Sequence, residues 1–142
     1  DELSFDAIHM MPKPAQAGGV PLWVSGTVNQ RVARRLATFG SGWIPWGDAI
    51  DDVVTGIARM KEAVAAAGRE AWDLRVLGTL PIVKADNGRI ALDATMEQVG
   101  VLRAAGVTDF LANVGVPADP VEAEDRLTPL VSAFRQAVGR TA

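Results

Sequence analysis

The residues best suited to chemistry follow a short apolar run near the start of the chain. Ser25, Gly26 and Thr27 come directly after that run, in the stretch PLWVSGT. Glycine lets a ligand approach the backbone closely, and the helix expected next presents free N–H groups and the positive end of its dipole. With two hydroxyl groups beside it, such a turn is suited to binding a phosphate. The alternative is that Thr27 only caps the helix and Gly26 only turns the chain.

A second short apolar run ends in WIPWG, where two tryptophans stand three residues apart. We expect this strand end to face the same site as the Ser-Gly-Thr turn. One tryptophan would lie in the wall of the fold and the other over a flat ring at the site, or both would be core residues. The loop that would face a substrate or the side of a cofactor comprises Pro45, Trp46 and Gly47.

Other polar groups fit structural roles. The single histidine, His9, has no catalytic partner at a recognisable spacing, and the chain has no cysteine. This composition argues against a zinc site, so we predict no metal and identify no catalytic residue. Three acidic residues fit helix-cap and dipole partners, and three arginines fit a solvent-exposed helix face. These are Asp48, Asp51 and Asp52, and Arg31, Arg34 and Arg35.

The elements that must position these groups follow a regular order. No apolar run alternates as a half-exposed antiparallel strand would, so the pattern predicts a parallel sheet with helices outside it. Residues 1–20 contain two prolines and a Gly-Gly pair, and we expect them to form an extended arm. Strands are expected at 21–24, at 42–44, within 74–83 and at 110–114, with helices near 27–39, 48–68, 93–105 and 119–138.

Local signals mark the helix ends. Thr27 and Gln30 form a T-x-x-Q capping box for the first helix, and Asp119 with Pro120 opens the last one. Pro129 falls inside that last helix and predicts a break or a late start. Gly106 is expected to end the third helix. The expected inward stripe of the second helix comprises Ile50, Val53, Val54, Ile57 and Val64.

Four β-then-α units fit either a small doubly wound domain or half of a (β/α)8 barrel. In both architectures ligands bind at the carboxyl ends of the strands. An open half-barrel leaves two strand edges and its inner face uncovered, so it should pair with itself or with the missing half. The residues at the four strand ends are 25–28, 45–47, 81–84, and Asn113 with Gly115 and Val116.

Composition excludes several classes of function. The 142 residues are 49% hydrophobic, which is enough for a folded core, and the net charge of −3 argues against nucleic acid as a partner. No run of eighteen apolar residues exists, so we expect no membrane span. The absence of cysteine is consistent with a cytoplasmic protein.

These pieces together resemble the carboxy-terminal half of the luciferase-like monooxygenase family, whose members use a flavin or the deazaflavin coenzyme. The resemblance covers nearly the whole chain and keeps its order. It rests on PKP (12–14), PLWVSG (21–26), RRLA (34–37), GSGWIP (40–45), AAAGRE (65–70) and LRAAGVTDFLANV (102–114).

The resemblance implies a (β/α)8 TIM barrel in which residues 21–142 supply the last four units after the arm at 1–20. It implies that the cofactor phosphate lies against Ser25, Gly26, Thr27 and Val28, with the loop 45–47 near the cofactor side chain or the substrate. The implied function is an oxidoreductase or monooxygenase that acts on a small organic substrate with FMN or the deazaflavin coenzyme. The family's proton-handling residues come mostly from the first half of the barrel, so no catalytic residue is carried over.

Two other hypotheses stay open at this point. In the first, the chain is a non-catalytic, truncated half-barrel that self-associates through its open strand edges. A third interpretation is an unrelated phosphate-binding α/β domain that takes sugar phosphates or nucleotides but no flavin.

Overall fold

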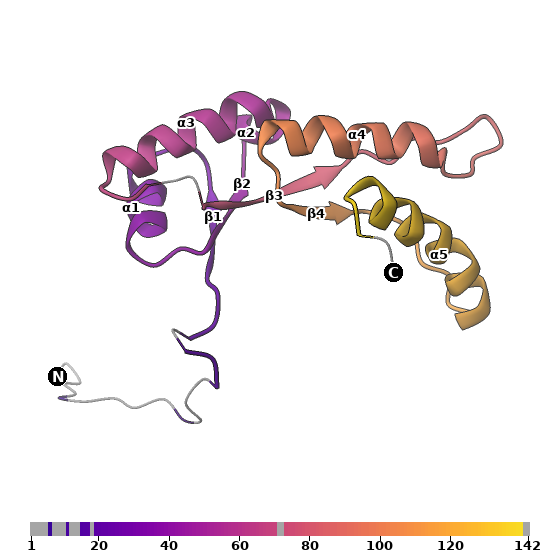
Figure 1. Cartoon of the computed structure of the whole chain (residues 1–142), viewed down its shortest axis with the longest axis horizontal. Coiled ribbons are helices and arrows are strands. Elements are labelled where there is room, and N and C mark those ends of the chain that lie inside the picture. The colour runs from indigo at the N-terminus through magenta and orange to yellow at the C-terminus, as the bar shows by residue number, and fades with distance from the viewer. Residues whose placement is uncertain (1–5, 7–10, 12–14, 18, 71–72, 141–142) are drawn as a thin grey trace, which may run out of the picture.

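A computed structural model of the chain describes residues 6, 11, 15–17, 19–70 and 73–140 (Figure 1). The arm expected over residues 1–20 falls largely outside these residues. The strands are β1 (Trp23–Gly26), β2 (Gly42–Pro45), β3 (Arg75–Leu80) and β4 (Asp109–Ala112). The helices are α1 (Gln30–Thr38), α2 (Asp48–Asp51), α3 (Val53–Ala66), α4 (Leu92–Ala105) and α5 (Pro120–Ala137).

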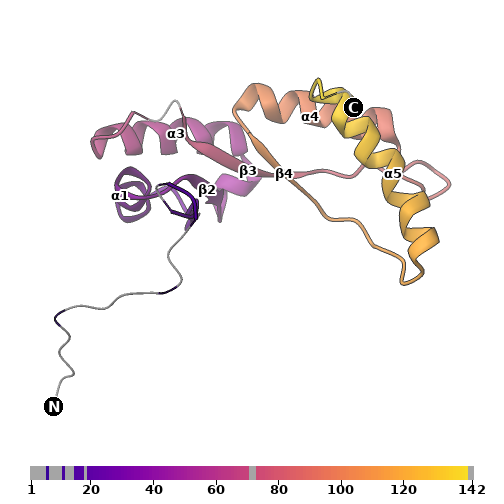
Figure 2. The same ribbon diagram turned by 60° about the horizontal axis from the view of Figure 1, so that its bottom comes forward.

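The four strands form one sheet in the order β1-β2-β3-β4, and every neighbouring pair is parallel. A doubly wound domain reverses its strand order, whereas successive right-handed crossovers in one direction place the helices on one face. Both views show α3 and α4 along the same side of the strands (Figures 1 and 2). The sequence prediction of four β/α units from half a barrel is therefore confirmed, and the doubly wound alternative is wrong.

The hydrophobic core lies between the sheet and these helices. Val24, Trp43 and Val76 project from three neighbouring strands into it, and all three are buried. At the end of the sheet Phe110 meets Phe134 of α5 edge to face, with ring centroids 5.4 Å apart. The helices contribute the fully buried residues Leu36, Ile57, Met60, Val64 and Val99.

The capping box predicted for the first helix is wrong. The helix α1 begins at Gln30, and its cap is Asn29, whose Oδ1 accepts a hydrogen bond from the Val32 N–H at 3.0 Å. The Asn29 Nδ2 donates to the Thr27 hydroxyl oxygen at 3.0 Å, so Thr27 stays in the turn before the helix. Asparagine is at least as good an N-cap as threonine. Asn29, not Thr27, is the residue that directly precedes the helix.

The single helix expected near 48–68 is divided at Asp52 into α2 and α3. Asp52 has non-helical dihedral angles (φ −129°, ψ 80°), and its Oδ1 accepts from the Thr55 N–H at 3.1 Å. The residue before α2 is Gly47, so Asp48 lies inside the first turn of α2 and does not cap it. The break changes which side of the helix faces the core, so Ile50 and Val54 are each 55% exposed. Their predicted inward orientation is therefore wrong.

The last helix follows its predicted start but not its predicted break. The Asp119 side chain accepts hydrogen bonds from the N–H groups of Val121 and Glu122, both at 3.0 Å. The helix α5 then runs without interruption through Pro129, so the expected break is wrong. Proline removes one backbone hydrogen bond there, and the packing of α5 on α4 around the buried Leu130 keeps the helix intact.

Candidate functional site

The ends of β1 and β2 lie side by side at the carboxyl edge of the sheet. Gly26 is in register with Pro45, the last residue of β2. Beyond the strands, a Cβ built on Gly47 would stand 3.0 Å from the Thr27 methyl carbon. The turn after β1 and the loop after β2 therefore lie next to each other. We expected this from the glycines that mark the two strand ends.

Gly26 is required by packing. Its φ is +153°, and a Cβ there would stand 2.7 Å from Cγ2 of Val32 in α1. Its carbonyl accepts a hydrogen bond from the Trp43 indole N–H at 2.9 Å, which ties β1 to β2 at this point. These contacts fix the shape of the turn whether or not a ligand binds.

The turn presents a set of free hydrogen-bond donors. Ser25 and Thr27 are both exposed. The Thr27 hydroxyl accepts from Asn29, which leaves its own proton free to donate to a ligand. Among the described residues, none accepts a hydrogen bond from the N–H groups of Gln30 and Arg31 in the first turn of α1. Hydroxyls and free amides at a helix start are the donors that a phosphate needs, so the residues present fit that group.

Two further residues complete the turn. Val28 is half-buried against the core, so its side chain faces the protein and only its backbone faces the turn. Asn29 was not singled out from the sequence. Asparagine's preference for the N-cap position, three residues before the apolar Val32, is the signal that would have found it.

A cleft of about 410 Å³ opens beside Thr27, between the turn and helices α2 and α3. Asp48, Asp52 and Arg59 line it. Hydrogen bonds from the side chain and backbone of Thr55 hold the pKa of Asp52 below its usual value of 3.8, so this carboxylate is ionised at neutral pH. The cleft therefore offers carboxylates that accept hydrogen bonds from hydroxyl groups, beside the one guanidinium of Arg59.

The two tryptophans of the WIPWG stretch have different environments. Trp43 is fully buried in the core and uses its indole N–H within the protein. Trp46 is 61% exposed in the loop after β2, next to Gly47. The alternative that both are core residues is wrong, and the Trp46 ring is accessible for stacking.

The ends of the other two strands lie elsewhere. Lys84 pairs with Ile90 in an isolated bridge that closes the loop after β3. That loop and the first half of α5 enclose a second cavity of about 510 Å³, whose lining includes Arg89 and Arg126. None of the residues 81–84 or 113–116 lines the cleft beside Thr27.

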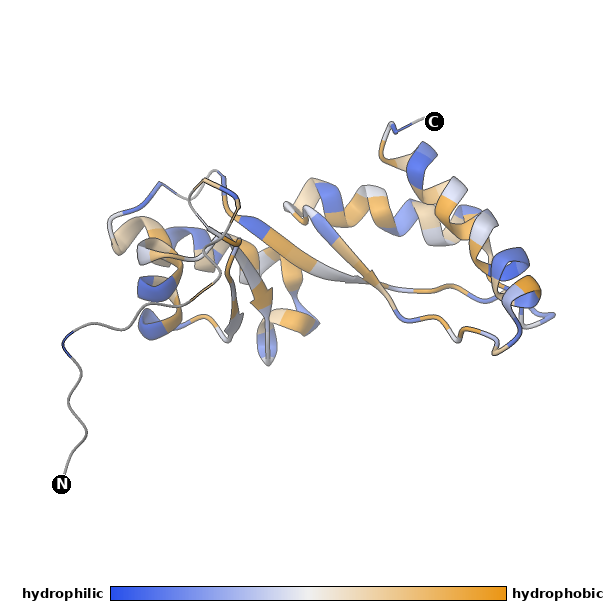
Figure 3. Cartoon of the chain, turned by 90° about the horizontal axis from the view of Figure 1, so that it is seen from below, coloured by the Kyte–Doolittle hydropathy of each residue, from blue (hydrophilic) through white to orange (hydrophobic). Residues whose placement is uncertain are grey.

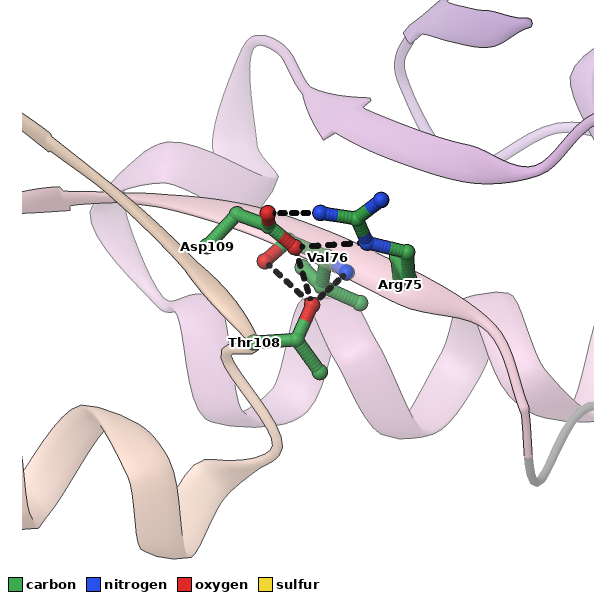
Figure 4. A network of polar contacts seen from close by, with 4 residues as sticks. All are labelled: Arg75, Val76, Thr108 and Asp109. Carbon is green, nitrogen blue, oxygen red and sulfur yellow. Dashed lines mark hydrogen bonds and ion pairs between the residues drawn. The ribbon is translucent and has the colours of Figure 1, made fainter. Parts of the chain in front are cut away.

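A row of contacts that sequence reasoning missed crosses the face of the sheet opposite the core. The Trp23 ring lies over Gly42, and the Arg75 guanidinium stands 5.0 Å from the centroid of that ring. Arg75 forms a two-point ion pair with Asp109 on β4, and Thr108 donates its hydroxyl to the same carboxylate at 2.7 Å (Figure 4). Burial raises the pKa of Asp109, but the hydrogen bonds from Arg75 and Thr108 outweigh it and leave the pKa lowered.

The described part of the chain contains neither a metal-binding cluster nor a membrane-spanning helix. Within residues 6, 11, 15–17, 19–70 and 73–140, no three His, Cys, Asp or Glu side chains gather so as to hold a metal ion. His9 lies outside those ranges. Nor does any helix of this described part have the length and apolar character to cross a membrane.

Comparisons with known proteins agree with the architecture. No curated protein matches the chain. A family model described as luciferase-like monooxygenase matches residues 2–134, a range that contains all four strands and the turn after β1. The fold of four parallel β/α units is that of half such a barrel, and the resemblance inferred from the sequence is confirmed. The chain belongs to the luciferase-like monooxygenase family of oxidoreductases.

Proposed function

We propose that the chain supplies the carboxy-terminal half of the barrel of a flavin- or deazaflavin-dependent oxidoreductase. In this proposal Ser25, Gly26, Thr27 and Val28 hold the phosphate of the cofactor. The observation that carries the proposal is the juxtaposition of this donor-bearing turn with the loop after β2 at the carboxyl edge of the sheet. Catalytic sites of barrel enzymes lie at that edge.

Each group of residues has a separate part in holding the cofactor. The hydroxyls of Ser25 and Thr27 donate to the phosphate, together with the amides that open α1. Asp48 and Asp52 accept hydrogen bonds from hydroxyl groups on the chain between the phosphate and the ring. Trp46 covers one side of the ring system or of a small organic substrate. When bound, the cofactor supplies the hydride or oxygen chemistry, and these residues position it.

The remaining groups of the site come from the other four units of the barrel. The family members handle protons mostly with residues from the first half of the barrel. The chain alone is therefore a binding half-site, and its affinity for the cofactor is the property to measure.

The test is a tryptophan-fluorescence titration with three ligands: FMN, riboflavin and the deazaflavin coenzyme. Trp43 and Trp46 lie beside the turn, and a bound flavin quenches their emission. Because riboflavin is FMN without its phosphate, we expect FMN to bind in the micromolar range and riboflavin more weakly. Saturation by the deazaflavin coenzyme and not by FMN would assign the cofactor to the deazaflavin type.

Thr27→Val removes the hydroxyl that would contact the phosphate, and the Asn29 Nδ2 that donated to this hydroxyl keeps its hydrogen bond to the Thr27 carbonyl at 3.2 Å. The substitution keeps the shape of the side chain and removes one donor to a charged group, so FMN affinity should fall about tenfold while riboflavin affinity stays unchanged. Thr38→Val is the matched control, because Thr38 is exposed at the far end of α1 and donates only to the Arg34 carbonyl. A substitution of Gly26 would not serve, since any Cβ there meets Val32. Equal binding of FMN and riboflavin, or wild-type affinity in Thr27→Val, would refute the proposal.

A further inference from the structure

The cavity of about 510 Å³ between the loop after β3 and the first half of α5 has no part in the proposed cofactor site. None of its lining residues lines the cleft beside Thr27, and none belongs to a strand. Seen from below, the loop after β3 and the start of α5 reach the same end of the molecule, and both carry hydrophilic and hydrophobic residues (Figure 3). The cavity has the size of a small-molecule site, and both of its walls come from this chain.

One wall is a tight turn that hydrogen bonds hold in place. The Gly88 N–H donates to the Ala85 carbonyl, and the Ala85 N–H donates to the Arg89 carbonyl, both at 2.8 Å. The Arg89 N–H donates to the side-chain oxygen of Asn87 at 3.0 Å. The backbone that carries Arg89 is therefore fixed by contacts within the turn itself.

The other wall is one face of α5. Its cavity-lining residues recur at helical spacing, and they are Glu122, Asp125, Arg126 and Pro129. The Asp119 cap holds the start of this helix, and α5 packs against α4. This wall is therefore also held in place by the fold.

Two guanidinium groups and two carboxylates line the cavity, those of Arg89, Arg126, Glu122 and Asp125. Within the part of the chain that the structure describes, none of these four side chains forms an ion pair. Glu122 and Arg126 stand four residues apart, a spacing at which such pairs form on a helix. The Arg126 guanidinium lies beside Gly115 instead, with its Nη atoms 3.9 and 4.0 Å from a Cβ built there. All four charges are thus available to a ligand.

The mixture of charges determines which class of ligand fits. A ligand with only an anionic group would meet two carboxylates, and a ligand with only a cationic group would meet two guanidinium groups. A zwitterion satisfies both pairs, because guanidinium groups bind a carboxylate and carboxylates accept hydrogen bonds from an ammonium group. The lining also includes Ile90, Leu92 and Pro129, against which an aliphatic side chain would be buried.

We propose that this cavity binds a free amino acid with an aliphatic side chain. Arg89 and Arg126 hold its carboxylate, and Glu122 and Asp125 hold its ammonium group. The proposal does not depend on whether the turn after β1 binds a cofactor. Because the two sites share no residue, either proposal can fail without the other.

An amide nuclear magnetic resonance titration of the chain with L-leucine tests the proposal. We expect saturable shifts of the signals of residues 87–92 and 121–126, while those of Gly26 to Arg31 stay in place. Two analogues each carry one charge: 4-methylpentanoate lacks the ammonium group, and 3-methylbutylamine lacks the carboxylate. Each should bind at least about tenfold more weakly than leucine, because each leaves one pair of charges without a partner.

Variants remove one charge of each sign from the cavity. Arg126→Gln and Asp125→Asn should each raise the dissociation constant of leucine at least about tenfold. Arg135→Gln is the matched control, because Arg135 is exposed in the last turn of α5 and does not line the cavity. Far-UV circular dichroism confirms that each variant is folded. No saturable shift with leucine, equal affinity for either analogue, or an equal loss of affinity in Arg135→Gln would overturn the proposal.

Discussion

At the scale of single residues, Gly26 and Gly100 are glycines with opposite surroundings. A methyl group on Gly26 would meet Val32 at 2.7 Å with φ at +153°, whereas one on Gly100 in α4 would meet nothing within 4 Å. We expect Gly26→Ala to lower the free energy of unfolding by about 1–3 kcal/mol, from steric overlap and backbone strain. Gly100→Ala should raise it by about 0.5–1 kcal/mol, because alanine is the better helix former. Urea unfolding of both variants measures these changes, and effects of the same sign would contradict this packing.

The Asp109 carboxylate gives a pH-dependent prediction. Its folded pKa lies below the ordinary value of 3.8, because hydrogen bonds from Arg75 and Thr108 outweigh the effect of burial. A lowered folded pKa contributes stability that is present above 3.8 and is lost as the pH falls through the folded value. We expect the unfolding free energy of the wild type to fall more steeply below about pH 4 than that of Asp109→Asn. Parallel curves for the two proteins in urea unfolding at decreasing pH would show that the ion pair does not stabilise the fold.

The residue scale also shows where sequence reasoning failed. The stretch TVNQ contains two good cap residues, Thr27 and Asn29, and the capping-box pattern favoured the first. The structure uses the second: Asn29 accepts from the Val32 N–H, and the Thr27 hydroxyl accepts from the Asn29 side chain instead of capping the helix. Local propensity does not distinguish the two, because both residue types are good N-caps.

At the scale of elements, α5 tests how a helix tolerates proline. Pro129 is exposed and lies inside an uninterrupted helix of 18 residues. Pro129→Ala restores a backbone hydrogen bond and removes the clash of the ring with the preceding turn. We expect it to stabilise the protein by about 1–3 kcal/mol, measured as a higher urea midpoint at an unchanged slope.

The matched change at the start of the same helix is Asp119→Ala. It removes the acceptor for two backbone N–H groups, so it should destabilise the protein by about 1 kcal/mol. If Pro129→Ala instead lowered the midpoint, the proline ring would have to make packing contacts that outweigh the lost hydrogen bond.

The order of the elements was predictable from the sequence. Which side of each helix packs against the core was not always predictable. Buried parallel strands are short apolar runs between glycines and prolines, and all four were found within a few residues of their bounds. The division of one predicted helix at Asp52 was missed because Ile50, Val53, Val54 and Ile57 continue a helical period across it. The side chain of Asp52 accepts a hydrogen bond from the Thr55 N–H and starts a new helix there. A hydrophobic period does not reveal that a side chain competes with a backbone carbonyl for this N–H.

At the scale of the whole molecule, the order β1-β2-β3-β4 with parallel pairing decides the architecture. The alternation of apolar runs and amphipathic stretches predicted parallel β/α units but left the doubly wound order open. The resemblance to the family was what favoured the sequential order. The contacts across strands did not follow from it. The row from Trp23 through Arg75 to Asp109 joins residues far apart in the chain, and only the strand register brings them together.

We propose that the turn after β1 holds the phosphate of a flavin-type cofactor, and each residue of that turn has an amide signal that can report on binding. The most direct test is an amide nuclear magnetic resonance titration of the chain with FMN, repeated with riboflavin. We predict that FMN shifts the amide signals of Gly26 to Arg31 and the indole signal of Trp46, and that riboflavin leaves the signals of Gly26 to Arg31 in place. Shifts centred on the cavity at Arg89 and Arg126, or the same shifts with both ligands, would contradict the claim.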